Sequence, residues 1–245
     1  HPCLVLLEDR INANRMKKAV LKYHRKNPID ILQTPNYKAP GLDVCHNGAF
    51  PVVCRCSSYQ PLWRSANGRE KNMADAIVDY FEAQQLTQAD ASFSPSEFIA
   101  RTYQRFEGVS PTVIRTPLAM ERVMEDPSVY QTHLQDKRYL LYFGAMNGVK
   151  GMDLLIEAMP LILSKYENIN FVLVGRNDPL PNGQRAYDVI QSQLKNYLYE
   201  KRILYFSSLP HSQLFPIIKH ALGVVMPSRV DNYPNACLEA LSLGV

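Results

Sequence analysis

Two carboxylates near the end of the chain, Asp231 and Glu239, have the type and spacing that indicate ligand chemistry. The apolar run 222–227 predicts a strand, a polar loop follows it, and a helix is expected from about Asn235 to Ser242. The N-terminus of that helix would offer backbone N–H groups to sugar hydroxyls or phosphate oxygens. A carboxylate beside it can accept hydrogen bonds from ribose hydroxyls, as in dinucleotide-binding folds. The spacing equally favours a simpler interpretation, in which Asp231 forms a turn and Glu239 is an exposed helical residue.

A second candidate is Lys150, in the segment 145–151 between an expected strand and an expected helix. A lysine in such a strand–loop–helix passage can place its ammonium against a diphosphate, to which the helix N-terminus adds N–H groups. The segment is neither a Walker loop nor a GxGxxG motif. Taken alone, it favours the competing interpretation of a solvated lysine in a loop whose glycines only turn the chain.

Short apolar runs and longer helical patterns alternate along the chain. Near-continuous apolar strands separated by helices predict parallel sheets covered on both faces. The expected strands are 29–34, 50–56, 91–94, 139–144, 169–175, 202–206 and 222–227, and the expected helices are 95–107, 184–199, 235–242 and one that opens at 151–153.

The helix expected at 95–107 carries its own start signal. The order Ser94, Pro95, Ser96, Glu97 resembles a capping box, with Ser94 as the cap, Pro95 in the first helical position and Glu97 reaching back to the cap. Its apolar spacing predicts three buried side chains, those of Phe98, Ile99 and Tyr103.

The stretch 115–137 contains two prolines, turns polar and precedes a fresh strand, which predicts a domain boundary. We expect an N-terminal Rossmann-like domain at 1–120, a linker at 121–137 and a C-terminal Rossmann-like domain at 138–245. Two such halves would face a central cleft, with ligands at the carboxyl ends of the strands. Because His1 is not a natural initiator and Gly244–Val245 have the pattern of a new strand, we expect both domains to be incomplete.

The composition excludes several classes of protein. The content of 46% hydrophobic and 20% charged residues is typical of soluble globular proteins and not of disordered chains. The net charge of +4 suits phosphate-bearing substrates or an anionic membrane surface, but it is too small to indicate nucleic acid. No apolar run approaches the roughly 20 residues of a membrane span, and no GxSxG or HExxH signature supports a hydrolase.

The chain has 5 cysteines, an odd number without a CxxC pair. Cys54 and Cys56 would share one face of a strand, which is a poor geometry for zinc, and Cys237 lies in an apolar helix pattern. We interpret them, with Cys3 and Cys45, as reduced thiols of a cytosolic protein.

Three weaker features remain open. The segment 11–26 is basic and amphipathic and could approach anionic lipids that carry an acceptor, although a solvated helix face is the stronger interpretation. Ser57 and Ser58 follow the strand 50–56 and could line the acceptor side of the cleft, or form a plain loop. His211, at an expected helix start, is better interpreted as a capping or surface residue than as a base.

The segment PSRVDNYPNACLEALSLGV (227–245) resembles the signature of retaining glycosyltransferase family 4, PSxxEGFPNxxLEAxxxGxPVV, with Asp231 in place of the first glutamate. Upstream, FGAMNGVKGMDLLIEAMPLI is similar to the family's VGRxxxxKGxDLLIEAF. INFVLVG and RILYFSSLPHSQLFPIIKHALGVVMPS match later family segments, and ADASFSPSEFIARTYQRF is similar to ADAVIAVSExxxxxL. The resemblance covers about residues 29 to 245 and is strongest over 138–245.

The resemblance implies a GT-B fold and transfer of a sugar, with retention of anomeric configuration, from a nucleotide diphosphate sugar to an unknown acceptor. Lys150 would bind the diphosphate, Glu239 the ribose, and Asp231 would lie near the transferred sugar. These three are the expected catalytic residues, and no metal or other cofactor is expected. Donor-binding residues would be Gly144, Asn147, Lys150, Arg176, Ser228, Tyr233, Pro234, Asn235 and Glu239.

Three departures from the family pattern matter. Ala145 stands where the family usually has an arginine, so a bidentate phosphate ligand is missing unless Arg176 replaces it. Ser57 stands near where many members have a histidine, and Asp231 is one carbon shorter than glutamate. The alternative is therefore a degenerate GT-B protein that binds a nucleotide sugar or a partner without turnover. A third hypothesis, an epimerase of nucleotide amino sugars, lacks a signature for the acid/base pair it would need.

The expected partners follow from the same resemblance. They are a nucleotide-sugar donor and a sugar or lipid-linked acceptor, with no nucleic acid. The expected location is the cytoplasm, with peripheral contact at the inner membrane face. The oligomeric state stays open.

Overall fold

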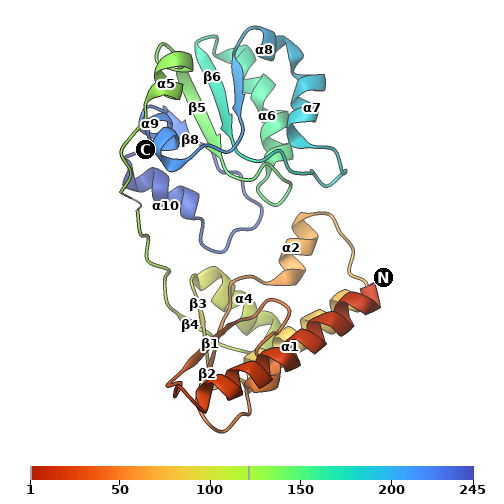
Figure 1. The fold of residues 1–245 in the computed structure, drawn as a ribbon. Helices are drawn as coiled ribbons and strands as arrows, with labels where there is room; N and C mark the ends of the chain where they lie inside the picture. Colours follow the sequence, from red (N-terminus) through yellow and green to blue (C-terminus); the bar gives the residue numbers. More distant parts are fainter. Residues whose placement is uncertain (1, 121) are drawn as a thin grey trace. The chain divides into compact units, whose positions relative to one another are not determined.

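The computed structural model describes residues 2–120 and 122–245, with side chains from Leu7 onward. The chain forms two compact units, of which unit 1 comprises 1–65 and 69–116 and unit 2 comprises 66–68 and 117–245. Each unit contains a four-stranded sheet in which all paired strands are parallel (Figure 1). The predicted α/β class with two parallel sheets is therefore confirmed.

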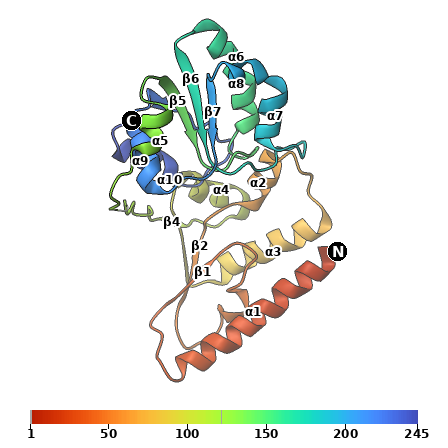
Figure 2. The ribbon, with the colours of Figure 1, turned by 45° about the horizontal axis from the view of Figure 1, so that its top comes forward.

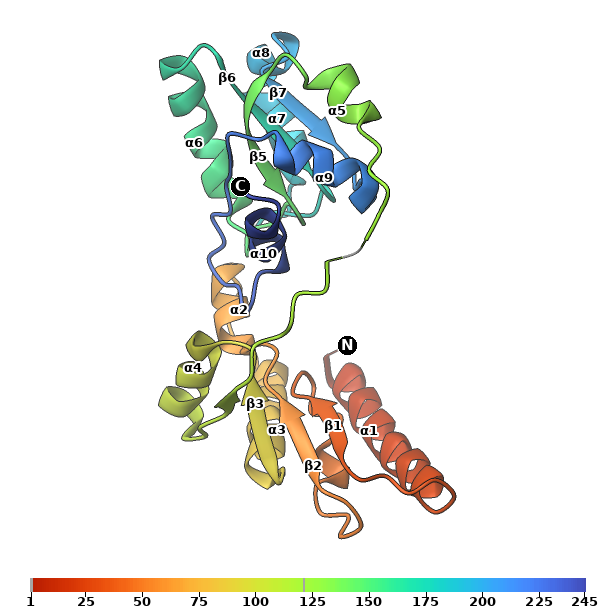
Figure 3. The ribbon, with the colours of Figure 1, turned by 90° about the vertical axis from the view of Figure 1, so that its left-hand side faces the viewer.

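The sheet of unit 1 has the strand order β1-β2-β3-β4, and Figure 3 shows β1, β2 and β3. Its core lies mainly on one face, where Val52, Cys54 and Cys56 are fully buried, while the intervening Val53 and Arg55 are only half-buried. The strands are β1 (Leu32–Pro35), β2 (Val52–Arg55), β3 (Ala91–Ser94) and β4 (Thr112–Val113), and the helices are α1 (Pro2–His24), the 3-10 turn η1 (Leu42–Val44), α2 (Gln60–Ala66), α3 (Met73–Gln88) and α4 (Glu97–Glu107).

The predicted start of α4 is wrong. Ser96, not Ser94, is the cap, because Ser94 is still part of β3, whereas Ser96 is extended and its side chain accepts the N–H of Ile99 at 3.3 Å. Pro95 consequently precedes the helix. Ile99 and Tyr103 are buried as predicted, but Phe98 is 52% exposed and does not join the core.

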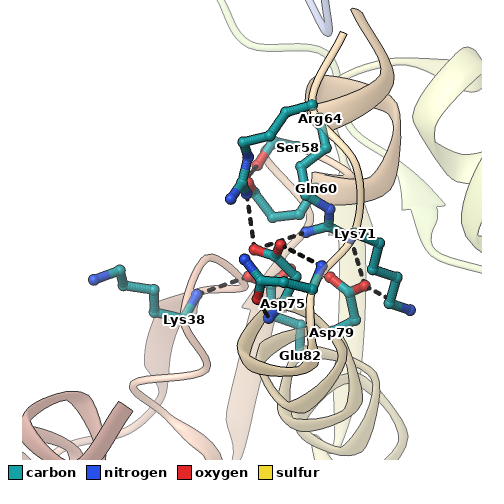
Figure 4. Close-up of polar contacts among 10 residues, drawn as sticks. Lys38, Ser58, Gln60, Arg64, Lys71, Asp75, Asp79 and Glu82 are labelled. Carbon is teal, nitrogen blue, oxygen red and sulfur yellow. Dashed lines mark hydrogen bonds and ion pairs between the residues drawn. The ribbon is translucent and has the colours of Figure 1, made fainter. Parts of the chain in front are cut away.

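Helix α3 was not expected from the apolar pattern, because its inward face is polar. A capping box between Asn72 and Asp75 starts it. Glu82 accepts the N–H of Lys38 at 2.9 Å (Figure 4). Gln85 donates to the carbonyl of Pro35 at 2.8 Å. The helix thus fixes the loop after β1 through hydrogen bonds to buried side chains.

The sheet of unit 2 has the order β7-β6-β5-β8, and Figure 2 shows β5, β6 and β7. Its two central strands are almost continuously buried, so apolar side chains from helices pack on both faces. The strands are β5 (Arg138–Phe143), β6 (Ile169–Val174), β7 (Ile203–Phe206) and β8 (Gly223–Val224), and the helices are α5 (Ser128–His133), α6 (Met152–Lys165), α7 (Ala186–Gln193), α8 (Lys195–Tyr199), α9 (His211–Lys219) and α10 (Asn235–Ser242).

Two elements of unit 2 differ from expectation. The helix predicted at 184–199 is divided into α7 and α8, because Leu194 leaves the helical conformation at φ −118° and ψ 25°. The strand predicted at 222–227 shrinks to Gly223–Val224, since β8 pairs with β5 only there. The units divide after Thr116, and α5 lies within the stretch 121–137.

Cys54 lies in β2 and Cys56 directly follows it, and both side chains are fully buried. Burial raises the pKa of Cys54 to about 11, so it is a poor source of thiolate. The side chain of Cys3 lies outside the described residues. Within residues 2–120 and 122–245 we find no helix that combines the length and the apolar character needed to cross a membrane. The same ranges contain no cluster of three or more His, Cys, Asp or Glu able to hold a metal ion.

Candidate functional site

Two adjoining pockets lie where β5, β6 and β8 of unit 2 end. Their volumes are about 300 Å³ and about 340 Å³, and they share the lining residues Phe143, Gly144 and Ala236. Because the strands are parallel, their carboxyl ends bring together loops that are far apart in the sequence. We call these cavities the lysine pocket and the Glu239 pocket.

The lysine pocket contains an ion pair between Lys150, on the loop after β5, and Asp231, on the loop after β8. The two side chains are 30% and 20% exposed, so both charges remain accessible to a ligand. The side-chain oxygen of Asn147 accepts the backbone N–H of Lys150 at 3.0 Å and shapes the turn that presents the lysine. The wall consists of Tyr142, Phe143, Gly144, Lys150, Met226, Ser228, Asp231, Tyr233, Pro234, Asn235 and Ala236.

Close backbone contact joins the two loops that carry this ion pair. Gly151 has φ +69°, and a Cβ atom there would lie 1.9 Å from the carbonyl oxygen of Pro227, so only glycine fits. The guanidinium of Arg229 donates to both carboxylate oxygens of Asp153, at 2.6 and 2.8 Å, and to the carbonyl of Gly148 at 2.9 Å. These contacts place Lys150 opposite Asp231.

Arg229 and Asp153 each stabilise the charged form of the other. Burial alone would raise the pKa of Asp153, but the hydrogen bonds and charge of Arg229 outweigh it and keep this pKa below its ordinary value. The hydrogen bond to Asp153 raises the pKa of Arg229 in turn. Both groups stay ionised at neutral pH, so the bracing of the two loops does not depend on pH there.

Helix α10 begins at the wall of the lysine pocket. Pro234 precedes its first turn, and no side chain caps that turn. Asn235 and Ala236 line the cavity, so the positive end of the helix dipole faces it. An anion in this pocket would meet both the Lys150 ammonium and the amides of α10.

Glu239 lies one turn further along α10 and lines the second pocket, together with Arg176 and His211. Gly175 has φ +151°, and a Cβ atom there would lie 1.8 Å from the carbonyl oxygen of Gly144, so the ends of β5 and β6 touch. The side chain of Arg176 is 72% exposed and lies 3.1 Å from the carboxylate of Asp178. The remaining wall residues are Phe143, Gly144, Ala145, Val174, Gly175, Ser208, Leu209, Leu214 and Ala236.

Most of the predicted donor residues meet at these pockets. Asn147 lines neither of the two and acts on the turn of Lys150 instead. Arg176 and Glu239 line the Glu239 pocket. Seven predicted residues line the lysine pocket, namely Gly144, Lys150, Ser228, Asp231, Tyr233, Pro234 and Asn235.

Ser57 and Ser58, the predicted acceptor-side residues, lie in unit 1 on the loop after β2. The N–H of Ser57 donates to the side-chain oxygen of Asn36 at 2.8 Å, and the carbonyl of Ser58 accepts the hydroxyl of Tyr103 at 2.7 Å. Buried polar side chains thus hold this loop at the carboxyl edge of its own sheet. No role in acceptor binding follows from these contacts alone.

The sequence reasoning missed several wall residues. The sequence predicts Phe143 and Met226 only as strand residues, but both lie at or just beyond the carboxyl end of a parallel strand, where ligands bind. Ser208, on the loop after β7, was not singled out. His211 was interpreted as a capping or surface residue, but it opens α9, stacks on Phe215 at 5.1 Å and lines the Glu239 pocket.

Comparisons with known proteins support the fold of the chain and show what its C-terminal part is similar to. Residues 128–245 match the protein family described as "Glycosyl transferases group 1". The chain is 25% identical over 134 residues to the phosphatidylinositol N-acetylglucosaminyltransferase gpi3 subunit of Schizosaccharomyces pombe, a match that covers 55% of this chain and 27% of that protein.

Two solved structures have a similar fold. Sucrose-phosphate synthase from Thermosynechococcus elongatus has a TM-score of 0.73 at 20% identity, over 95% of this chain and 58% of that one. WaaG, a glycosyltransferase involved in lipopolysaccharide biosynthesis, has a TM-score of 0.64 at 16% identity, over 92% of this chain and 60% of that one. The chain thus spans about three-fifths of each structure and a quarter of the curated relative. It has the α/β fold of GT-B glycosyltransferases, and its residues 128–245 match glycosyl transferases group 1.

Proposed function

We propose that the protein transfers a sugar from a nucleotide diphosphate sugar to an acceptor, with retention of anomeric configuration. One observation carries the proposal. Lys150 and the N-terminus of α10 converge on one pocket, and Glu239 of the same helix lines the pocket next to it. In a nucleotide diphosphate sugar, the diphosphate lies between a ribose and a sugar. Such a ligand would fit with its diphosphate at Lys150 and the α10 amides and its ribose at Glu239.

Each residue then has a role. The Lys150 ammonium and the α10 amides bind the diphosphate, and Glu239 accepts hydrogen bonds from the ribose hydroxyls. Asp231, released from Lys150 by the incoming phosphate, accepts hydrogen bonds from the hydroxyls of the transferred sugar. Tyr233, Pro234 and Asn235 provide the backbone that meets this sugar.

The chemistry follows from where charge develops. As the bond between the anomeric carbon and the phosphate oxygen breaks, negative charge accumulates on the leaving diphosphate. In the donor complex, Lys150 and the helix amides bind that oxygen and stabilise the charge in the transition state. The acceptor oxygen bonds to the anomeric carbon on the face the phosphate leaves, and its proton passes to the leaving phosphate. No metal takes part in the proposed reaction.

The acceptor class is suggested by the curated relative, whose name describes transfer of N-acetylglucosamine to phosphatidylinositol. A lipid-linked acceptor is therefore the first to test, before soluble glycans and sugar phosphates. Nucleotide diphosphate forms of N-acetylglucosamine are the first donors to test for the same reason.

The test is release of nucleoside diphosphate, with the anomeric configuration of the product read by NMR. We expect release that depends on the acceptor and a product with retained configuration. Lys150→Ala should lower turnover by about 100-fold or more, whereas Lys165→Ala, which removes an exposed lysine at the end of α6, should not change it. An inverted product would contradict the proposed mechanism.

A second candidate function is donor binding without turnover. The observation that favours it is Ala145, which lines the Glu239 pocket where an arginine would hold a phosphate with two hydrogen bonds. Arg176 lines the same pocket but is held beside Asp178. Tight donor binding without release of nucleoside diphosphate, for every acceptor class, would favour this function over transfer.

A further inference from the structure

Helix α1 of unit 1 has two halves of different charge. Glu8 and Asp9 lie in the first half, whereas residues 10–29 contain no acidic side chain. The second half and the two residues after it carry six cations, namely Arg15, Lys17, Lys18, Lys22, Arg25 and Lys26. Positive charge is therefore concentrated on one end of a single helix, although the whole chain has a net charge of only +4.

The ion pairs of unit 1 sharpen this contrast. In the first half, Arg10 pairs with Asp43, and Asp9 pairs with Lys38. Within residues 7–120 and 122–245, none of the six cations of the second half forms an ion pair. Five of the six side chains are exposed, and Lys17 is half-buried. Their charge is thus available to an external partner.

The face of α1 opposite these cations packs against the rest of unit 1. Ala13 is buried, and Val20 and Leu21 pack against the apolar cluster around Val52. The ring of His24 accepts the N–H of Ile29 at 2.9 Å and contacts Phe50 at 4.9 Å. Figures 1 and 3 show α1, in red, lying along unit 1 beside β1. The helix is held by its apolar side and directs its basic side away from the core.

The exposed basic face of α1 has the composition of a membrane-contact surface. Arg15, Lys18 and Lys22 recur at helical spacing on one face. Tyr23, 59% exposed, lies beside them, and tyrosine is an amphipathic side chain suited to the boundary between water and lipid. Clusters of four to eight Lys or Arg on one helix attract anionic lipid headgroups.

We infer that the basic face of α1 docks the protein on an anionic lipid bilayer. Because Ala13, Val20 and Leu21 of α1 are already packed on unit 1, the helix cannot bury these side chains in the membrane as a free amphipathic helix does. Docking is therefore electrostatic adsorption to headgroups, reversible by salt. This surface is separate from the pockets of unit 2, and the inference does not depend on the proposed transferase activity.

The test is cosedimentation of the full chain with vesicles of phosphatidylcholine that contain or lack phosphatidylserine. We expect binding only to the anionic vesicles, lost at about 1 M salt, where the Debye length falls to about 3 Å. The variant Lys18→Glu/Lys22→Glu should reduce binding at low salt by at least about tenfold, because two attractive charges become repulsive.

The matched control is Arg185→Glu/Lys195→Glu, which makes the same change of net charge at two exposed positions of unit 2. It should bind vesicles as the unchanged protein does, and circular dichroism should show both variants folded. If both variants lost vesicle binding equally, binding would depend only on the net charge of the protein, and the inference would be overturned. Equal binding to uncharged vesicles, no binding to anionic ones, or binding to duplex RNA without binding to vesicles would also overturn it.

Discussion

The two units are built around similar parallel sheets but are held together by different means. In unit 2, β5 and β6 are almost continuously buried, and glycines let the strand ends and loops touch. In unit 1, β2 alternates between buried and half-buried residues, and the polar side chains of α3 hold the loops. Apolar strands, close glycine contacts and the Arg229–Asp153 ion pair thus position the candidate donor site, whereas the buried polar side chains of α3 position the loops of the other unit.

The buried polar face of unit 1 is extensive. Gln85 donates to Thr34, Pro35 and Cys54 and accepts the N–H of Gly41 at 2.6 Å. Arg64 of α2, whose side chain is only 6% exposed, is paired with Asp79 of α3 (Figure 4). Such networks specify one arrangement when every group is paired and become costly when one group is removed. This contrast between the units leads to three predictions.

The largest effect is expected for Gly175→Ala in unit 2. Its Cβ atom would lie 1.8 Å from a backbone oxygen, which no side-chain rotation can relieve. We expect a loss of about 5 kcal/mol in the free energy of unfolding of unit 2, or failure of that unit to fold. Gly183→Ala is the control, because it has φ +82° and no atom within 4 Å of the added Cβ. It should cost only about 1 kcal/mol, measured by denaturant unfolding. Equal costs would contradict the close backbone contact.

Gln85→Leu should cost about 4 kcal/mol in unit 1, because it leaves the buried N–H of Gly41 and other polar groups without partners. The only tryptophan, Trp63, lies in α2, so its fluorescence reports the unfolding of unit 1. Gln84→Leu changes the neighbouring, partly exposed residue and should cost less than about 1 kcal/mol. A similar small cost for both would show that the polar network of α3 does not hold the loops.

Unit 1 should also be the pH-sensitive one. Burial, opposed in part by the N–H of Lys38 and reinforced by the charge of Asp79, raises the pKa of Glu82 to about 7. The folded state therefore binds this proton more tightly than the unfolded chain, whose carboxyl titrates near the ordinary value of 4.5. Stability from this group is present below pH 4.5 and is lost as pH rises through about 7. The loss is about 3 kcal/mol.

Denaturant unfolding followed by Trp63 fluorescence from pH 4.5 to pH 8 measures this dependence. Glu82→Gln should flatten the curve in that window, while a control substitution of the exposed Glu70→Gln should leave it unchanged. A curve of Glu82→Gln that still falls with pH as in the unchanged protein would assign the effect to another group.

The sequence predicted unit 2 better than unit 1 for a physical reason. The apolar runs of β5 and β6 have a clear strand signature, and α10 was expected with its observed bounds. Apolar periodicity did not predict helix α3, because the polar residues Glu82 and Gln85 occupy core positions of that helix. The start of α4 was misplaced because Ser94 and Ser96 are both good caps, and only the pairing of β3 with β4 decides between them.

The sequence could predict those residues of the candidate site that follow the carboxyl ends of parallel strands. Lys150 and Asp231 come from loops about 80 residues apart, and the parallel order of the sheet brings them together. Asn147 was placed in the ligand site because it neighbours Lys150 in sequence, although its side chain turns back onto the backbone. The apolar walls at Phe143 and Met226 carry no polar signature and become visible only in the folded chain.

The most direct test of the central claim, that unit 2 binds a nucleotide sugar through Lys150 and Glu239, is calorimetric titration with UDP, GDP and their common sugars. We predict binding of one nucleotide that Lys150→Ala and Glu239→Gln each weaken by about tenfold or more, an energy of about 1.4 kcal/mol, while Lys165→Ala binds as the unchanged protein does. No binding of any nucleotide by the folded protein, or equal weakening by Lys165→Ala, would contradict the assignment of the donor site.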